Sequence, residues 1–231
     1  MRDTSPIQIE THLSRTSLFG DLPEPRLQRV ARASKMFPLG KHSALFHSGE
    51  ACQGLNLIIY GQLKLAFSST DGSEKVFDIL QSGSCFGETE LLLDEPYRVH
   101  AQALDDCLVL QVPRATVLEL IGDDGEFAYK MLNGMSKRIH DLLLDLEDFT
   151  LLSGTGRVVG FLLREAEATE PGADKVVIRL PAAKGVVASR LNLSAEHFSR
   201  ILHELADRDL LTVSQRTLAI PSIKRLRNAL V

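Results

Sequence analysis

The spacing of apolar residues changes along the chain, which predicts parts of different architecture. Up to about residue 112, short runs of β-branched and apolar residues alternate with turn residues, as in antiparallel strands. Gly49, Gly61, Gly72 and Gly83 recur every 11 or 12 residues, and we expect tight turns with positive φ at these glycines. A β-roll or sandwich is therefore predicted after a short helical lead-in, with strands over residues 55–60, 62–67, 75–80, 100–104 and 108–112.

After Pro113 the apolar period becomes helical, with a short helix over residues 114–121 and a much longer one over about 126–152. The apolar positions of the longer helix alternate spacings of four and three, which is the a/d rule of a two-stranded coiled coil. This seam predicts a parallel homodimer; it comprises Ala128, Leu132, Met135, Ile139, Leu142, Leu146 and Phe149. The alternative is a helix buried against its own roll, because Met131 and Leu143 provide a second apolar flank.

A helix-turn-helix is predicted over residues 182–208, with a turn at residues 192–194 between two helices. Asn192 tolerates the left-handed conformation that the turn requires, and Ser194 is a good N-cap for the second helix. Residues 210–213 and 217–220 flank a short turn, which predicts a hairpin that would form a wing.

The second helix of this motif has two distinct faces. Its apolar residues Phe198, Ile201, Leu202 and Leu205 fall within one arc, and the polar residues Glu196, Ser199, Arg200 and His203 occupy the opposite arc. An acceptor, a hydroxyl and a guanidinium are groups that contact base edges in the major groove, so this arc is a candidate DNA reader. The alternative is a solvated helix on which Glu196 and Arg200 form an i,i+4 salt bridge.

Cationic and hydroxyl side chains around this helix suit contacts with phosphates. We assign Lys184, Ser189, Arg190 and Ser194 to the DNA-binding set on this ground, with a further cationic surplus from Arg208, Arg216, Lys224, Arg225 and Arg227. Gly154 and Gly156 interrupt the preceding helical pattern and mark a hinge. The fold class is therefore α+β, in three parts: a β-roll sensor over residues 1–122, a dimerisation helix over 123–153, and a winged helix-turn-helix over 154–231.

Charge, hydropathy and cysteine content argue against several classes of protein and site. The net charge of −4 argues against indiscriminate binding to nucleic acid. No window approaches the roughly 18 apolar residues of a membrane span, and the first fifteen residues are polar where a secretory signal would be apolar, so we expect a cytoplasmic protein that does not bind a membrane. The three cysteines contain no C-x-x-C pair, and no catalytic motif occurs, so we expect neither a four-thiolate metal site nor an enzyme.

The order of these parts resembles that of the Crp/Fnr superfamily of bacterial transcription regulators across nearly the whole chain. The resemblance implies that the roll is a jelly roll like those that bind cyclic nucleotides. Local motifs that agree with it are Gly49-Glu50, Gly61, Phe86-Gly87-Glu88, Pro96-Tyr97-Arg98, Thr155-Gly156-Arg157 and residues 193–200. Glu196 to Arg200 resembles the E-x-x-S-R pattern of the Fnr and Dnr branches, whereas Ala195 replaces the arginine of the Crp type. This implies a homodimer on inverted repeats of TTGA-type half-sites, with RNA polymerase as a partner if the protein activates transcription.

The resemblance also implies an effector pocket, whose expected residues are Gly87, Glu88, Arg98, His100, Leu142 and Leu143. Glu88 could hold a ribose hydroxyl, but the Arg-Ser-Ala phosphate motif of cyclic AMP receptors is replaced by Arg98-Val99-His100-Ala101. Leu142 and Leu143 stand where two hydroxyl residues would contact adenine, and a buried unsatisfied purine edge costs about 1–3 kcal/mol. Cyclic AMP is therefore disfavoured.

Other effectors remain open. The Fnr cluster motif is missing because no cysteine precedes Cys52, which argues against an iron-sulfur cluster. Similarity to Dnr implies nitric-oxide sensing through haem, with an axial ligand among His12, His42, His47, His100 and His140. Cys85 is either a redox switch or a buried apolar cysteine. Two rival interpretations are a cyclic-nucleotide-responsive regulator of the Crp type and a small-molecule-binding module that contacts protein rather than DNA.

Overall fold

The structure, a computed structural model, describes residues 6–69 and 72–230, so the first five residues of the polar N-terminus lie outside it. The chain divides into two compact units, Met1–Ile139 and His140–Val231. The expected α+β class is confirmed: a β-domain, a long helix and a helix-turn-helix domain follow one another in the chain. The division falls inside the long helix rather than at either of its ends.

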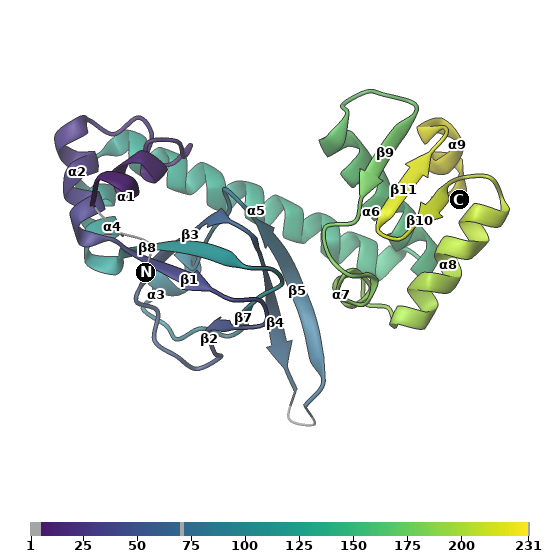
Figure 1. Cartoon of the computed structure of the whole chain (residues 1–231), viewed down its shortest axis with the longest axis horizontal. Coiled ribbons are helices and arrows are strands. Elements are labelled where there is room, and N and C mark those ends of the chain that lie inside the picture. Colours follow the sequence, from purple (N-terminus) through teal and green to yellow (C-terminus); the bar gives the residue numbers. More distant parts are fainter. Residues whose placement is uncertain (1–5, 70–71, 231) are drawn as a thin grey trace. The chain divides into compact units, whose positions relative to one another are not determined.

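The first unit is a β-roll made of two four-stranded antiparallel sheets, of orders β1-β8-β3-β6 and β2-β7-β4-β5 (Figure 1). Every strand predicted in this unit is present within one or two residues. The sequence pattern missed the short strands β1, β2 and β6. The strands are β1 (Lys35–Leu39), β2 (Ala44–Phe46), β3 (Gly54–Tyr60), β4 (Gln62–Ser68), β5 (Glu74–Gln81), β6 (Cys85–Phe86), β7 (His100–Ala103) and β8 (Cys107–Pro113).

Alternating burial along the strands is consistent with the roll. Along β5 every second side chain from Val76 to Leu80 is buried, because successive side chains of a strand point to opposite faces. The predicted tight turns are confirmed, since Gly49, Gly61 and Gly83 each have a φ of 89° and Gly72 has 82°. Two apolar clusters, one around Leu57 and Leu110 and the other around Ile58 and Val109, form the core.

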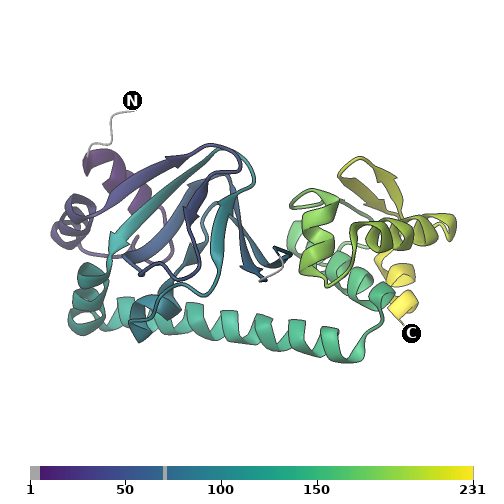
Figure 2. The same cartoon turned by 90° about the horizontal axis from the view of Figure 1, so that it is seen from below.

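Five helices accompany the roll and close part of its core: α1 (Pro6–Leu13), α2 (Glu24–Ala33), α3 (Glu88–Leu93), α4 (Arg114–Asp123) and α5 (Gly125–Leu151). The helical lead-in expected over residues 13–33 is confirmed for α2, whereas α1 lies before it and was not predicted. Helix α5 starts where Asp124 accepts the N–H groups of Glu126 and Phe127, and these bonds lower the pKa of the Asp124 carboxyl. Its first turns run beside the roll (Figure 2) and bury Phe127 and Met131 in the core.

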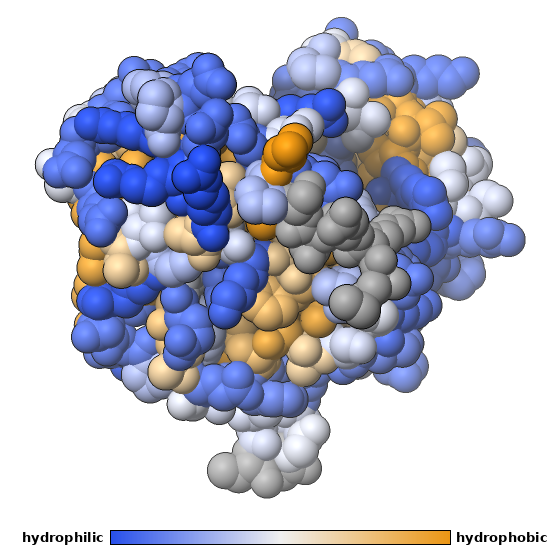
Figure 3. Space-filling model, turned by 60° about the vertical axis from the view of Figure 1, so that its left-hand side comes forward, coloured by the Kyte–Doolittle hydropathy of each residue, from blue (hydrophilic) through white to orange (hydrophobic). Residues whose placement is uncertain are grey.

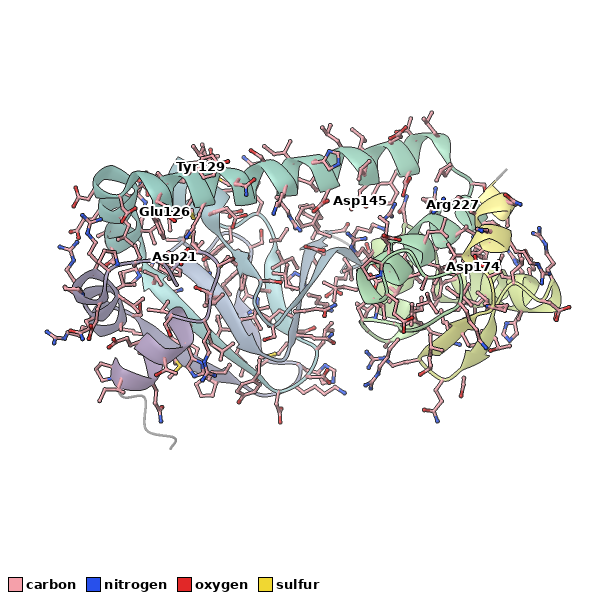
Figure 4. The ribbon with its side chains drawn as sticks, turned by 90° about the horizontal axis from the view of Figure 1, so that it is seen from above. Asp21, Glu126, Tyr129, Asp145, Asp174 and Arg227 are labelled. Carbon is pink, nitrogen blue, oxygen red and sulfur yellow. The ribbon has the colours of Figure 1, made fainter. Side chains whose placement is uncertain are left out.

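In Figure 3, hydrophilic side chains cover most of the visible face, with apolar side chains showing between them. Figure 4 shows Glu126 and Tyr129 on the first turns of α5 and Asp21 on the neighbouring segment. Lys130 joins both carboxylates, and they raise its pKa. No helix among the described residues is long and apolar enough to cross a membrane.

The second unit contains the end of α5 and a compact helical domain with a three-stranded sheet of order β10-β11-β9. Its remaining elements are α6 (Gly154–Thr169), β9 (Val176–Arg179), α7 (Lys184–Arg190), α8 (Ala195–Asp207), β10 (Thr212–Ser214), β11 (Thr217–Ile220), α9 (Ile223–Arg227) and the 3-10 turn Asn228–Leu230. The predicted hairpin is confirmed as β10 and β11. Asp174, labelled in Figure 4, accepts the backbone N–H of Lys224 at 3.0 Å and so anchors the start of α9.

The expected break in the helical pattern is present between Leu151 and Gly154, but Gly154 and Gly156 themselves lie in the first turn of α6. The chain instead leaves the helix at Leu152 and Ser153. The Ser153 hydroxyl oxygen accepts the N–H of Gly156 at 3.1 Å, which makes Ser153 the N-cap of α6.

We expect Gly61→Ala to destabilise the roll more than Gly49→Ala, as measured by thermal unfolding. Both glycines have the same φ of 89°, so each alanine variant has the same backbone strain, about 1–2 kcal/mol. A Cβ at Gly61 would also lie 2.5 Å from the Asp106 oxygen and the Cys107 sulfur, whereas nothing lies within 4 Å of one at Gly49. Equal melting temperatures for the two variants would contradict this account of the turn.

Candidate nucleic-acid interface and effector residues

Helices α7 and α8 form the predicted helix-turn-helix. Asn192 has the expected left-handed φ of 58°, and the Leu193 N–H donates to the Ala188 carbonyl at 2.9 Å, which closes the turn. The Ser194 hydroxyl oxygen accepts the N–H of His197 at 3.1 Å, so Ser194 is the N-cap that the sequence predicts. Helix α7 begins at Lys184, two residues later than expected.

The two faces of α8 are divided as predicted. Its apolar arc, made of Phe198, Ile201, Leu202 and Leu205, is buried. Glu196, Arg200 and His203 are exposed, and Ser199 is half-buried at the edge of the polar arc. The helix therefore presents an acceptor, a guanidinium and an imidazole to solvent from one side.

The exposed side chains of α8 are held weakly. Glu196 accepts its own backbone N–H and the Ser194 hydroxyl, and these bonds lower the pKa of its carboxyl. Arg200 Nε lies 3.9 Å from Glu204 Oε1, at the limit of an ion pair, and both side chains are exposed. Among the described residues no ion pair joins Arg200 to Glu196, which was the alternative that the sequence left open. The guanidinium of Arg200 is consequently able to reorient toward another acceptor.

The cations that precede α8 have different environments. Arg190 Nη2 lies 3.1 Å from Asp145 Oδ2, and the two side chains are only 21% and 19% exposed. Asp145, labelled on α5 in Figure 4, and Asp148 also face Arg164 of α6. Arg190 is thus part of a partly buried ion-pair network within the second unit. Lys184 and Ser189 are half-buried, and no ion pair of Lys184 is found in the described part of the chain.

Two arginines have structural roles that sequence reasoning missed. Arg157 donates to the carbonyls of Leu191 at 3.0 Å and Leu152 at 3.3 Å, so it connects the end of α5 to the helix-turn-helix turn. The sequence analysis singled out Arg157 as part of the Thr155-Gly156-Arg157 motif, but the motif did not predict which carbonyls accept its hydrogen bonds. Arg216, which the sequence placed in the cationic surplus suited to phosphates, donates to two backbone carbonyls, at positions 180 and 181, and its Nε is buried without a partner.

Of the residues expected in an effector pocket, Gly87 and Glu88 adjoin at the start of α3. Gly87 has a φ of 91°, and Glu88 is half-buried, with no hydrogen-bond partner at its buried Oε2. Burial raises the pKa of the Glu88 carboxyl. Arg98 is 78% exposed and pairs with Glu95 at 3.2 Å, and no hydrogen bond or ion pair joins it to Glu88 within the described ranges. Leu142 and Leu143 are exposed and belong to the second unit.

Four of the five candidate histidines are exposed or already hydrogen-bonded, which does not favour them as axial haem ligands. His100 Nε2 lies 2.9 Å from Glu74, and its Nδ1 lies 3.1 Å from the Ser68 hydroxyl, so both ring nitrogens have partners. His12 is half-buried on α1, and burial followed by the nearby Arg15 lowers the pKa of its imidazole. The other candidates are exposed to solvent rather than set in an apolar pocket; these are His42, His47 and His140.

Cys85 is a poor candidate for a redox switch. Burial, followed by the negative charge of Glu88, raises the pKa of its thiol to about 12. The thiolate is the reactive form, so this thiol is unreactive at neutral pH. Cys85 is half-buried beside the apolar core, and its raised pKa favours a structural cysteine over a redox switch.

Two family models match the chain. The cyclic nucleotide-binding domain matches residues 37–124, and the Crp-like helix-turn-helix domain matches residues 156–229, which contain α7 and α8. The first match covers the roll and the second covers the compact domain that follows α5.

Several known proteins are similar over most of the chain. The cAMP-activated global transcriptional regulator Vfr of Pseudomonas aeruginosa is 24% identical over 77% of this chain and 85% of its own length. The structure of DNR from the same species is 28% identical, covers 95% of this chain and 96% of its own, and has a TM-score of 0.50. FixK2 from Bradyrhizobium japonicum has the same fold, with a TM-score of 0.73, 21% identity and coverage of 85% and 96%.

We expect Arg190→Gln to lower the thermal stability of the chain by about 1–3 kcal/mol, because it leaves the half-buried Asp145 carboxylate without its closest cation. Lys184→Gln is the matched control and is expected to change stability by less than about 0.5 kcal/mol. Thermal unfolding measures the loss of stability in both single variants and in the double variant Arg190→Gln with Asp145→Asn. The double variant should be closer to wild type than Arg190→Gln alone, and equal stability of the two single variants would refute the role of the pair.

Proposed function

Because the chain belongs to the Crp/Fnr family of transcription regulators, we propose that it binds operators made of inverted TTGA-type half-sites as an effector-gated homodimer. The observation that carries this proposal is the polar arc of α8, where Glu196, Arg200 and His203 are exposed on the side opposite a buried apolar arc. A recognition helix of this kind enters the major groove with its N-terminal residues at the base edges.

The chemistry of the arc suits this half-site. TTGA contains one G·C pair, whose guanine presents the O6 and N7 acceptors and whose cytosine presents the N4 donor in the major groove. In the proposed complex Arg200 donates to the guanine and Glu196 accepts from the cytosine. Arg200 is free to do so, since its contact with Glu204 in the free protein is 3.9 Å long and exposed. Ser199 and His203 supply the remaining polar contacts.

Phosphate contacts are proposed for Lys184, Ser189 and Ser194, which flank the reader. Arg190 contributes differently, because its ion pair with Asp145 connects α7 to the end of α5. The proposed role of Arg190 is therefore to position the helix-turn-helix rather than to neutralise a phosphate.

The proposed dimer interface is the apolar seam of α5. Crp-like helix-turn-helix regulators act as dimers, and the seam residues are left uncovered in the single chain: Leu132, Ile139, Leu142, Leu146 and Phe149 are exposed and Met135 is half-buried. A parallel pair of helices would bury this seam by knobs-into-holes packing. It would also place the two α8 helices one DNA turn apart, about 34–36 Å.

The proposed gate is a population shift in which effector binding to the roll favours the DNA-binding arrangement of the dimer. Arg157 suits the transmission of this shift, since it contacts the carbonyls of both Leu152 and Leu191. The proposal does not include haem or nitric oxide, because the exposure and hydrogen bonds of the candidate histidines do not favour an axial haem ligand. If the protein activates transcription, RNA polymerase is its partner on the promoter.

We expect Arg200→Ala to abolish the preference for a TTGA inverted repeat over random duplex, because it removes the guanine contact, worth about 1–3 kcal/mol in each half-site. Lys184→Ala should weaken binding to both duplexes about equally. Fluorescence anisotropy at one stated salt concentration measures the four affinities. Equal losses on both duplexes for Arg200→Ala would contradict the assignment of Arg200 to base reading.

We expect Leu146→Glu to convert the dimer to monomer, because it places two charges in the apolar seam where they would be buried without partners. Leu151→Glu is the matched control: Leu151 is 72% exposed on the same helix and lies off the seam. Sedimentation velocity distinguishes the two. A dimeric Leu146→Glu variant, or a wild-type chain that is monomeric throughout, would rule out this interface.

A further inference from the structure

The last residue of the apolar seam, Phe149, contacts the junction between α5 and the helix-turn-helix domain. The guanidinium carbon of Arg157, on α6, lies 6.0 Å from the centre of the Phe149 ring, at the outer limit of a cation–π contact. Phe149 is nevertheless 39% exposed in the single chain. The contact between this ring and the guanidinium is therefore open to water as long as nothing covers the seam.

Arg157 in turn holds the turn between α7 and α8. Its Nε donates to the Leu191 carbonyl at 3.0 Å, and its Nη2 donates to the Asn192 carbonyl at 3.4 Å. Its Nη1 donates to the Leu152 carbonyl at the end of α5, at 3.3 Å. A guanidinium is planar and its donors form a rigid fork, so the orientation of this one group sets all three hydrogen bonds together. Asn192 also has a positive φ of 58°, a conformation that needs support from its surroundings.

The start of α6 also packs closely against the same turn. A Cβ added at Gly154 would lie 3.1 Å from Leu193 Cδ2 and 3.2 Å from His197 Cε1, a spacing that leaves little room for a side chain. Leu193 belongs to the turn, and His197 lies in the first turn of α8. The position of α6 is therefore passed to the recognition helix by packing as well as by the hydrogen bonds of Arg157.

We propose that Phe149 and Arg157 couple dimerisation to the order of the helix-turn-helix turn. Burial of Phe149 between two α5 helices would exclude water from its contact with Arg157, and a cation–π contact is stronger when it is desolvated. The guanidinium is then held in the orientation that binds the turn, so that closing the seam fixes the recognition helix. This inference rests on the dimer interface proposed above. Phe149 and Arg157 act in it as positioning residues rather than as contacts to DNA.

Amide hydrogen exchange of the full-length protein without DNA tests this coupling. Mass spectrometry follows peptides that cover residues 189–194, where the Leu193 N–H is bonded to the Ala188 carbonyl. Phe149→Leu keeps an apolar side chain in the seam but removes the ring, so exchange in the turn should rise at least about threefold while the chain stays dimeric. Met135→Leu is the matched control at the equivalent seam position two heptads earlier, and it should leave this exchange unchanged.

A double-variant cycle shows whether Phe149 acts through Arg157. Arg157→Lys keeps the charge but loses the planar fork of donors, so exchange in the turn should rise at least about tenfold. Adding Phe149→Leu to Arg157→Lys should raise the exchange no further. The monomeric Leu146→Glu variant should also exchange faster than wild type in this turn, because its seam is open.

Equal exchange in wild type and in a dimeric Phe149→Leu variant would overturn the proposal, as would an equal rise in Met135→Leu or additive effects of the two substitutions. Peptides that cover β11 should exchange as in wild type, which shows that the second unit is folded; Phe149→Met or Arg157→Gln replaces a variant that fails this check. Sedimentation velocity of the same samples shows whether the dimer is present, so a dimer without the exchange difference refutes the coupling alone. Because DNA is absent, loss of operator binding leaves the coupling intact.

Discussion

The fixed orientation of α8 about its own axis, which decides which side chains face outward, is the constraint on which the proposed reading of DNA depends. Four apolar side chains of α8 are buried, and full burial of each contributes about 1.5–3 kcal/mol. The exposed contact between Arg200 and Glu204 contributes at most about 1 kcal/mol. Packing therefore decides which side of the helix faces outward, and the Ser194 cap decides where the helix begins. The positions of Glu196 and Arg200 follow from these two features.

The domain that carries α8 is fastened to the end of α5 by polar contacts. Arg157 contacts carbonyls on both sides of the junction, and Asp145 holds Arg190. These contacts join groups that are partly shielded from water, where electrostatic interactions are stronger than at the surface. A change in the end of α5 would thus be transmitted to the helix-turn-helix turn rather than be absorbed by a flexible linker. In the proposed gating, α5 is therefore the element through which the effector acts on DNA binding.

The spacing of apolar residues predicted those features of the fold that depend on which side chains are buried. The strands of the roll, the length of α5 and the two faces of α8 follow from which residues must be buried, and each is within a few residues of its expected position. The partners of charged side chains did not follow, because they depend on residues far apart in the sequence. Arg190 is bound by Asp145, Arg216 by two backbone carbonyls, and Arg138 by Asp78. The hinge was misplaced because glycine was taken to end a helix, whereas Ser153 caps α6 just before Gly154.

The most direct test of the account is the dependence of affinity on half-site spacing. Anisotropy titrations would compare a TTGA inverted repeat, with its half-sites one helical turn apart, with the same repeat lengthened by about five base pairs, which turns one half-site to the opposite side of the duplex. Two α8 helices fixed in one dimer should lose at least about a hundredfold in affinity on the longer operator, because the second half-site can no longer be engaged. Equal affinity for both operators would contradict the claim that paired, outward-facing recognition helices read this DNA.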